Sequence, residues 1–164
     1  MREVKAHANP PPTGAEAARP RTIPPIHLLG AALFEVCAAL ALPRLSYPGA
    51  LPVALGAAAF VAGAWLMMRT RNLMRARGTT HRFDPTACVV EDDVFARSRN
   101  PMYLGMTAIL GGAALALRNY AALAAPLYFF LVIDRVFVPF EEAKLEREIG
   151  PPYLAYKARV RRWL

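Results

Sequence analysis

Four apolar runs, each close to the length that crosses a bilayer, constrain this chain more than any other feature. They cover approximately Ile26–Leu45, Ala50–Met68, Pro101–Leu117 and Tyr120–Phe140. A helix needs about 20 residues to cross about 30 Å of hydrocarbon. The second and third runs carry no charged side chain, whereas Glu35 interrupts the first run and the pair Asp134-Arg135 interrupts the fourth. The runs predict an all-α polytopic membrane protein with about four transmembrane helices.

The distribution of basic residues predicts how these runs are oriented. Of the 164 residues 55% are hydrophobic, and the formal net charge is +8. Four Lys or Arg residues precede the first run, one lies at the junction of the first two, seven separate the second from the third, one lies between the last two, and six follow the fourth. This alternation follows the positive-inside rule for four crossings. We expect an integral protein of the bacterial inner membrane with both termini in the cytoplasm.

The same distribution bounds the partners and the domain organisation. The positive-inside rule already accounts for the positions of the basic residues, and no separate basic face is left that would bind nucleic acid. A nucleic-acid partner is therefore not expected. The proline-rich residues 1–25 are predicted to be a flexible tail, and residues 26–164 a single membrane domain. Cys37 and Cys88 should lie at different depths, and a disulfide is not expected. His27 and His81 are isolated in the sequence and no metal-ligand cluster is found, so no metal is predicted.

Two polar clusters flank the last two apolar runs. The first, residues 97–105, reads Arg-Ser-Arg-Asn-Pro-Met-Tyr-Leu-Gly, and the second begins with Glu141-Glu142. Only Arg118-Asn119 joins the two runs. At about 1.5 Å rise per residue, Pro101 and Glu141 each lie roughly 27–33 Å from this turn. A helical hairpin would therefore bring both clusters to the same cytoplasmic face, where they would form a pocket.

The residue types in these clusters suit a zwitterionic ligand. The N-terminus of a helix beginning at Pro101 favours an anion, and Arg97 and Arg99 add positive charge. Glu141 and Glu142 offer the opposite sign. A ligand with a carboxylate and an amine matches this pairing of charges. The methionine part of S-adenosylmethionine is one such ligand, but other zwitterionic ligands match equally well. If the ligand reacts, Arg99 could orient an anionic acceptor, and Glu142 is a possible base for an ammonium acceptor.

Several motifs together carry a family resemblance. They are Arg-Asn-Pro-Met-Tyr-Leu-Gly at 99–105, the apolar hairpin, Glu-Glu-x-x-Leu at 141–145, Gly-x-x-Tyr-x-x-Tyr-Lys at 150–157, the basic Arg-Trp end, and Gly-Thr-Thr at 78–80. Over about residues 65–164 the chain resembles the integral-membrane isoprenylcysteine carboxyl methyltransferases and the related phospholipid N-methyltransferases. The resemblance implies methyl transfer from S-adenosylmethionine to a lipophilic, membrane-resident acceptor with a carboxylate or amine headgroup.

The resemblance also implies positions for the cofactor contacts. By position they fall on Thr80, Ala87, Cys88, Val89, Val90, Phe95, Asn100, Pro101, Met102, Tyr103 and Glu141. The chain departs from the family at Asp93. Family members usually have Gly-Pro or Gly-Val directly before the aromatic residue, whereas this chain has Asp93-Val94 before Phe95. It departs again at Phe137, where the eukaryotic enzymes have a substrate-contacting Arg. Arg135 is a nearby residue that could substitute for it. Because the substrate-contacting Arg is missing, the resemblance does not imply prenylated proteins as substrates of this chain.

Charged residues within the apolar runs are the remaining candidates. Glu35 should lie near the middle of the bilayer, where a carboxylate is costly. It could line a tunnel for the lipid substrate, or it could be neutral and hydrogen-bonded to a neighbouring helix. Asp134 should face the bundle interior and pair with an Arg. The basic residues and Trp163 at the C-terminus are expected to form a segment on the membrane surface.

Two local features predict helix geometry. Pro139 suggests a kink or break just before the acidic pair. Small residues are expected to permit close packing between helices; they are Ala59, Gly63, Gly105, Gly111 and Gly112.

Three alternative functions remain open on the sequence alone. Sterol and steroid reductases share a similar C-terminal Pro-x-Tyr-x-Gly signature and bind NADPH. A non-catalytic binding or scaffold protein with a degenerate pocket would explain the missing Gly at Asp93. A small transporter would need a polar path through the membrane, for which only Glu35 and Asp134 are available.

Overall fold

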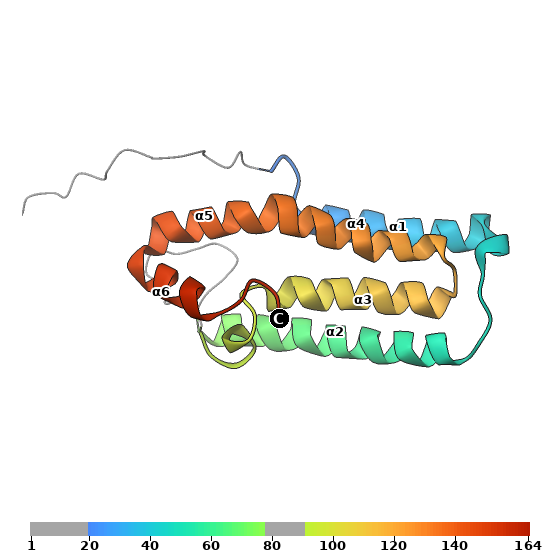
Figure 1. The fold of residues 1–164 in the computed structure, drawn as a ribbon, viewed down its shortest axis with the longest axis horizontal. Helices are drawn as coiled ribbons and strands as arrows, with labels where there is room; N and C mark the ends of the chain where they lie inside the picture. The colour runs from blue at the N-terminus through green and yellow to red at the C-terminus, as the bar shows by residue number, and fades with distance from the viewer. Residues whose placement is uncertain (1–19, 78–90) are drawn as a thin grey trace, which may run out of the picture.

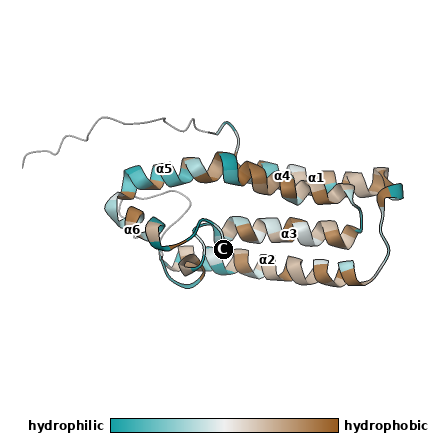
Figure 2. Cartoon of the chain, viewed as in Figure 1, coloured by the Kyte–Doolittle hydropathy of each residue, from teal (hydrophilic) through white to brown (hydrophobic). Residues whose placement is uncertain are grey.

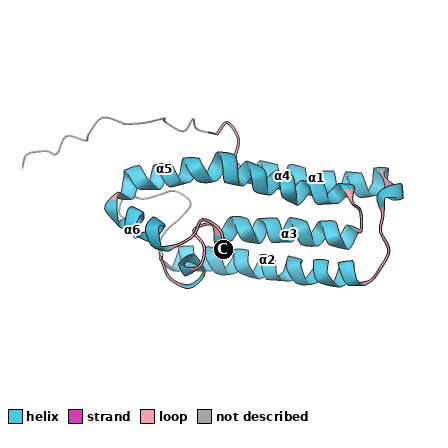
Figure 3. Cartoon of the chain, viewed as in Figure 1, coloured by secondary structure: helices cyan, strands magenta, loops and turns pink. Residues whose placement is uncertain are grey.

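The computed structural model describes residues 20–77 and 91–164 as helices joined by short connections (Figure 1). The elements in chain order are α1 (Pro24–Ala41), η1 (Pro43–Leu45), α2 (Leu51–Ala76), η2 (Asp93–Ala96), α3 (Pro101–Leu117), η3 (Ala121–Leu123), α4 (Ala124–Val132), η4 (Ile133–Phe137), α5 (Val138–Ile149) and α6 (Pro151–Arg159). Here η4 is a π-helix and the other η elements are 3-10 helices. Figure 3 shows no strand in these two ranges. The predicted all-α class is confirmed.

Three of the helical stretches are long and apolar enough to cross a membrane. They are Pro24–Ala41, Leu51–Ala76 and the continuous stretch Ala121–Ile149, while α3 is apolar but shorter, with 17 residues. Leu40 and Val61 are 77% and 66% exposed, as expected of side chains that contact lipid. In Figure 2 the bundle is mainly apolar, and hydrophilic residues gather on α5 and α6. The chain is therefore a polytopic membrane protein.

Proline residues mark where several helices begin. Proline occupies one of the first two positions of α1, α2, α3 and α6. A helix leaves its first N–H groups unpaired, so the missing N–H of proline costs nothing there, and its fixed φ angle suits the first turn. The predicted start of a helix at Pro101 is confirmed.

The helices form two layers. In Figure 1, α2 and α3 lie in one layer and α1 and α4 in the other. α3 and α4 are the two arms of the predicted hairpin. Its turn is fixed by Asn119, which is fully buried: its Nδ2 donates to the carbonyl oxygen of Leu42 at 2.9 Å, and its Oδ1 accepts from the N–H of Ala121 at 2.9 Å. The turn is thereby attached to the end of α1.

Two pairs of glycines let α2 and α3 approach closely. A methyl group on Gly56 would lie 2.5 Å from the carbonyl oxygen of Gly112, and one on Gly63 would lie 2.6 Å from that of Gly105. No larger residue fits at such distances without moving the backbone. The prediction of close packing is confirmed at Gly63, Gly105 and Gly112, but it is wrong at Gly111, where a methyl group would meet no described atom within 4 Å.

The helix that carries Glu141 and Glu142 contains a π-helical turn but is not interrupted. The π-helical turn Ile133–Phe137 lies directly before Pro139, and the helical stretch continues to Ile149. A proline cannot donate to the preceding turn and its ring crowds the carbonyl oxygen four residues earlier. A wider π turn accommodates this, as such bulges commonly do. The predicted irregularity is present, as a π-helical segment inside a continuous helix.

Candidate active site

The hairpin brings the two polar clusters together at one end of the bundle. The Tyr103 hydroxyl, in the first turn of α3, donates to Oε1 of Glu141 on α5 at 2.6 Å. Four residues before Tyr103, Nη2 of Arg99 lies 2.7 Å from Oε1 of Glu142, the neighbour of Glu141. These contacts join residues 38 and 43 positions apart. The convergence expected from helix rise is thus present in the structure.

Glu142 is held by three cations. Its side chain is only 6% exposed. Nη2 of Arg99 contacts Oε1 at 2.7 Å, Nη2 of Arg162 contacts Oε2 at 3.0 Å, and Nζ of Lys157 lies 3.5 Å from Oε2. The same hydrogen bond to Glu142 raises the pKa of the Arg162 guanidinium. Because a carboxylate with such partners is stabilised in its charged form, Glu142 is a weak proton acceptor. Its contacts suit a structural tie between α5, α6 and the start of α3.

The C-terminal segment, residues 160–164, folds back over the beginning of α3 (Figure 1). The carbonyl oxygen of Arg162 accepts from Nδ2 of Asn100 at 3.1 Å and from the hydroxyl of Ser98 at 3.2 Å. Ser98 is buried, and its oxygen in turn accepts from the N–H of Asn100 at 3.1 Å. The segment therefore fixes Asn100, the residue directly before α3.

The side chains of the same segment reach the π-helical turn. Nε1 of Trp163 donates to Oδ1 of Asp134 at 2.9 Å, and the Trp163 ring lies 4.8 Å from that of Phe130. Nη1 of Arg162 lies 3.5 Å from the same Asp134 oxygen. The predicted pairing of Asp134 with an Arg is confirmed. Arg162 and Trp163 both pack against the site, and their expected place on the membrane surface stays a prediction.

Glu141 has a different environment from its neighbour. It is partly buried and accepts the hydrogen bond from Tyr103. Asn100 precedes α3, and its side chain forms no cap on the helix. Pro101 has no N–H, and the first N–H groups of a helix have no partner within it. Those of Met102 and Tyr103 belong to the same helical turn as the Tyr103 side chain, whose hydroxyl contacts the Glu141 carboxylate.

The departure at Asp93 keeps the backbone shape that glycine permits. Its φ angle is +57°, in the left-handed region that few residues other than Gly adopt and that Asp tolerates. Nε of Arg69 on α2 donates to Oδ2 of Asp93 at 2.8 Å, which lowers the pKa of Asp93. The loss of glycine therefore does not by itself indicate a degenerate site.

Three further contacts fix the segment that carries Phe95. The neighbours Glu91 and Asp92 pair with Arg159 and Arg77. The carbonyl oxygen of Phe95 accepts from the Tyr156 hydroxyl at 2.9 Å, and burial raises the pKa of Tyr156 to about 12. The short helix η2 is thereby tied to α6, close to Arg99 and the start of α3.

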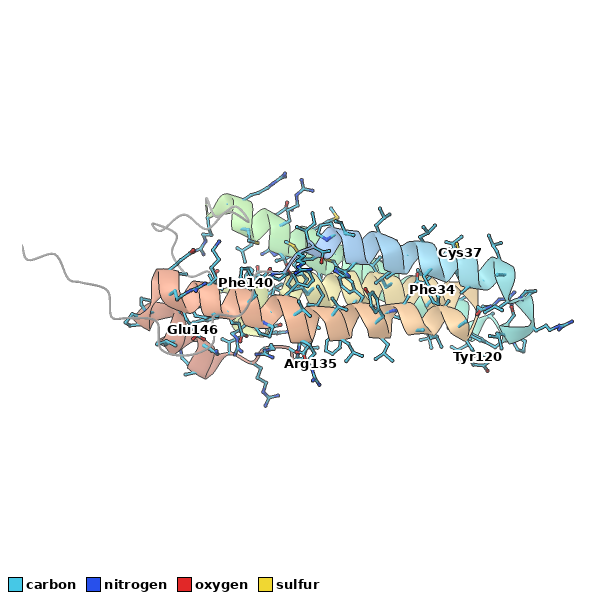
Figure 4. The ribbon with its side chains drawn as sticks, turned by 90° about the horizontal axis from the view of Figure 1, so that it is seen from above. Phe34, Cys37, Tyr120, Arg135, Phe140 and Glu146 are labelled. Carbon is cyan, nitrogen blue, oxygen red and sulfur yellow. The ribbon has the colours of Figure 1, made fainter. Side chains whose placement is uncertain are left out.

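Thr80, Ala87, Cys88, Val89 and Val90 lie outside the described residues. Arg135 contacts Asp134 at 3.2 Å, but its side chain is 77% exposed, and Figure 4 places it on the outer surface. Its role toward a substrate stays a prediction.

Glu35 lies far from the site. Nδ1 of His27 and the Tyr128 hydroxyl, 2.9 Å apart, set the register between α1 and the antiparallel α4. From this contact Glu35 is about 12 Å along α1 in one direction, and Glu141 about 20 Å along its own helix in the other. Glu35 is 2% exposed, and its Oε1 has no hydrogen-bond partner in the described ranges. The structure does not bring it to the acidic pair, and its predicted contact with a substrate stays untested.

Sequence reasoning missed Ser98, Arg162, Trp163 and Gly56. Arg162 and Trp163 are close to the C-terminus, and no periodic pattern connects them to a cluster some 60 positions earlier. Gly56 could have been found, because Gly56 and Gly63 have the same seven-residue spacing as Gly105 and Gly112.

The fold and the site together define a class: a polytopic all-α membrane protein with a polar site at one end of an apolar hairpin. The sequence profile of the phospholipid methyltransferases matches residues 51–150. The chain belongs to this family of membrane methyltransferases, and it is an integral membrane protein. The match extends from α2 to Gly150, so α1, α6 and the C-terminal segment lie outside it.

A shorter relative occurs in Haemophilus influenzae. This uncharacterized protein is 41% identical over 63 residues, which are 38% of the present chain and the whole of the relative. No solved structure matches the chain.

Proposed function

We propose that the protein transfers the methyl group of S-adenosylmethionine to a lipophilic acceptor in the membrane, one with an amine or carboxylate headgroup. The observation that carries the proposal is the hydrogen bond between Tyr103 and Glu141. It holds a carboxylate of α5 against the N-terminus of α3. Membership of a methyltransferase family supports methyl transfer over the reductase alternative.

The described residues fit the charges of S-adenosylmethionine. The Glu141 carboxylate suits its ammonium group, and the unpaired N–H groups of Met102 and Tyr103 suit its carboxylate. The family resemblance implies further contacts from Asn100, Pro101 and Phe95. When bound, S-adenosylmethionine supplies an electrophilic methyl carbon, to which the lone pair of the acceptor bonds as the carbon–sulfur bond breaks and leaves its electrons on sulfur.

Glu142 and Arg99 act as positioning residues in this proposal. The sequence suggested Glu142 as a base and Arg99 as a contact to an anionic acceptor. Arg99 directs its guanidinium to Glu142 and to the carbonyl oxygen of Lys157, 3.2 Å away. We assign both residues to holding the site in shape. A carboxylate acceptor needs no base, and the proton of an ammonium acceptor passes to water at the partly exposed polar end.

The proposal places this polar end on the cytoplasmic side of a bacterial inner membrane. Residue 20, where the described part begins, and the C-terminus lie at the same end of the bundle as the start of α3 (Figure 1). The basic residues gather at this end, as the positive-inside rule requires of a cytoplasmic face. The cofactor would enter from water and the acceptor from the bilayer.

A binding titration of the detergent-purified protein with S-adenosylmethionine and S-adenosylhomocysteine tests the proposal. Glu141→Gln keeps the size of the side chain and removes its charge. Since a hydrogen bond to a charged group contributes about 1.5–3 kcal/mol, affinity should fall roughly 10- to 100-fold. The matched control is Glu148→Gln on the same helix, because Glu148 faces Lys144 in a partly exposed pair and not the site.

The control should bind as the wild type does. Equal affinity of Glu141→Gln and the wild type would remove Glu141 from the cofactor site. Absence of binding by the wild type would overturn the proposed function, and stabilisation by NADPH instead would favour the reductase alternative.

A further inference from the structure

The end of α2 carries four arginines, which the structure divides into two pairs. Arg69 and Arg77 form ion pairs with the adjacent aspartates at the start of η2. Arg71 and Arg75 are exposed, and neither forms an ion pair or a hydrogen bond through its side chain with a residue of the ranges 20–77 and 91–164. The sequence of α2 contains no Asp or Glu. Two guanidinium groups one helical turn apart are therefore left without a counter-ion in the described part of the chain.

Arg71 and Arg75 lie where a lipid-facing stripe of α2 ends. The buried glycines of this helix face α3. A different side of the helix carries Val61, Trp65 and Met68, which are exposed and follow the three- and four-residue spacing of one helical face. Arg75 continues this face two turns after Met68, and Arg71 lies one turn before Arg75. The surface that contacts acyl chains therefore leads directly to the two guanidinium groups.

The length of α2 sets the depth of these arginines. Its 26 residues span about 39 Å, whereas the hydrocarbon of a bilayer is about 30 Å thick. No charged residue occurs in α2 before Arg69, so the apolar part ends at Met68. Arg71 and Arg75 lie about 5 and 10 Å beyond Met68 along the helix axis. They are thus at the level of the phospholipid headgroups.

An anionic headgroup complements this pair of arginines. A guanidinium binds phosphate oxygens through parallel N–H donors. A zwitterionic headgroup carries its own cation beside the phosphate, whereas the headgroup of phosphatidylglycerol carries none. Each basic residue near the headgroups favours an anionic lipid about fivefold. The apolar stripe favours a lipid over a soluble anion or an acidic peptide, because a lipid has acyl chains that cover it.

We propose that Arg71 and Arg75 bind the phosphate of an anionic phospholipid, whose acyl chains lie along the exposed stripe from Val61 to Met68. The positive-inside rule treats all basic residues alike, whereas the ion pairs with η2 single out these two arginines. The lipid is a bound neighbour of α2 and is distinct from the methyl acceptor, since this side of α2 is turned away from α3. The inference is independent of the proposed function.

Two double variants test the site. Arg71→Gln/Arg75→Gln removes both charges and keeps polar side chains of similar length. The matched control, Arg44→Gln/Arg118→Gln, removes two exposed arginines from η1 and from the end of α3, at the opposite end of the bundle (Figure 1). Because all four side chains are exposed, the thermal unfolding midpoints of both variants in detergent should equal that of the wild type.

Trp65 reports lipid contact at this face of α2. It lies about 9 Å along the helix axis from Arg71, at the level of the acyl chains, where bromine atoms on a lipid quench its fluorescence. The probes are phosphatidylglycerol and phosphatidylcholine, each brominated midway along its acyl chains, in vesicles that contain the full-length protein. Trp163 is the other tryptophan of the chain and is unchanged in all three proteins, so differences between them arise at Trp65.

Quenching gives the relative association of the two lipids with the site. In the wild type and in Arg44→Gln/Arg118→Gln, phosphatidylglycerol should associate roughly 10- to 30-fold more strongly than phosphatidylcholine, since two arginines contribute. In Arg71→Gln/Arg75→Gln the two lipids should differ by less than about twofold. Inorganic phosphate, added at constant ionic strength, should leave the wild-type preference unchanged.

Four results would overturn the inference. Equal quenching by the two lipids in the wild type, which needs no variant, would show that the face does not select an anionic headgroup. A preference retained by Arg71→Gln/Arg75→Gln, or lost equally in the control variant, would show that these two arginines do not provide the site. Loss of the preference on addition of inorganic phosphate would assign them to a soluble anion.

Discussion

At the scale of single residues, two adjacent carboxylates have different surroundings. Glu142 is nearly buried and held by Arg99, Arg162 and Lys157. Glu141 accepts a hydrogen bond from the Tyr103 hydroxyl. Adjacent positions on a helix point about 100° apart, so the two side chains meet different neighbours. We therefore assign stability to Glu142 and ligand binding to Glu141.

Glu142→Gln tests this division. The substitution leaves the Arg99 and Arg162 guanidinium groups without their carboxylate, and breaking a buried pair in this way typically costs 3–5 kcal/mol. Because Arg162 is 36% exposed, we expect the lower end of this range, a loss of about 3 kcal/mol in the free energy of unfolding. Thermal or denaturant unfolding in detergent measures it.

Glu141→Gln is the matched comparison for that measurement. It should leave the free energy of unfolding within about 1 kcal/mol of the wild type, since the amide oxygen of Gln can still accept the hydrogen bond from the Tyr103 hydroxyl. The assignment of roles would be reversed if Glu141→Gln were the less stable of the two variants.

At the scale of elements, the contact between α2 and α3 depends on which face of each helix carries glycine. Gly111 and Gly112 are adjacent in the sequence, yet only Gly112 faces α2. A methyl group on Gly112 would lie 2.5 Å from the carbonyl oxygen of Gly56 and 2.6 Å from the N of Phe60. The sequence predicted small residues at the interface, but it could not separate these two because both are small.

We expect Gly112→Ala to destabilise the protein and Gly111→Ala to leave it nearly unchanged. The first substitution forces two backbones apart, and overpacking of this kind costs about 1–3 kcal/mol. The second adds a methyl group in open space, so its effect should be within about 0.5 kcal/mol. Unfolding of both variants under the same detergent conditions measures the difference. Equal stabilities would show that α2 and α3 are not in close contact.

At the scale of the whole molecule, the C-terminal segment closes the site. Residues 160–164 connect α6 to the start of α3, to Glu142 on α5 and to Asp134 in the π-helical turn. Four parts of the chain therefore depend on the last few residues. Since the family profile ends at Gly150, this connection is not part of the matched region.

Removal of residues 161–164 should weaken both folding and cofactor binding. The truncation removes the carbonyl acceptor of Asn100 and Ser98 and one of the cations on Glu142. We expect a loss of about 3 kcal/mol in the free energy of unfolding and at least a tenfold weaker affinity for S-adenosylmethionine. Removal of Leu164 alone is the control, because this residue is 77% exposed. Unchanged affinity after the longer truncation would show that the segment does not shape the site.

The sequence by itself determined the apolar helices, the hairpin and the meeting of the two polar clusters at one end of it. These follow from helix rise and from the lengths of the apolar runs, which are properties measured along the chain. Only the tertiary structure decided that Arg162 and Trp163 complete the site, that Glu35 lies far from it, and that Gly112 and not Gly111 faces α2. The physical reason is that helix rotation and the path of the terminal segment are set by packing between distant residues, and no local pattern encodes that packing.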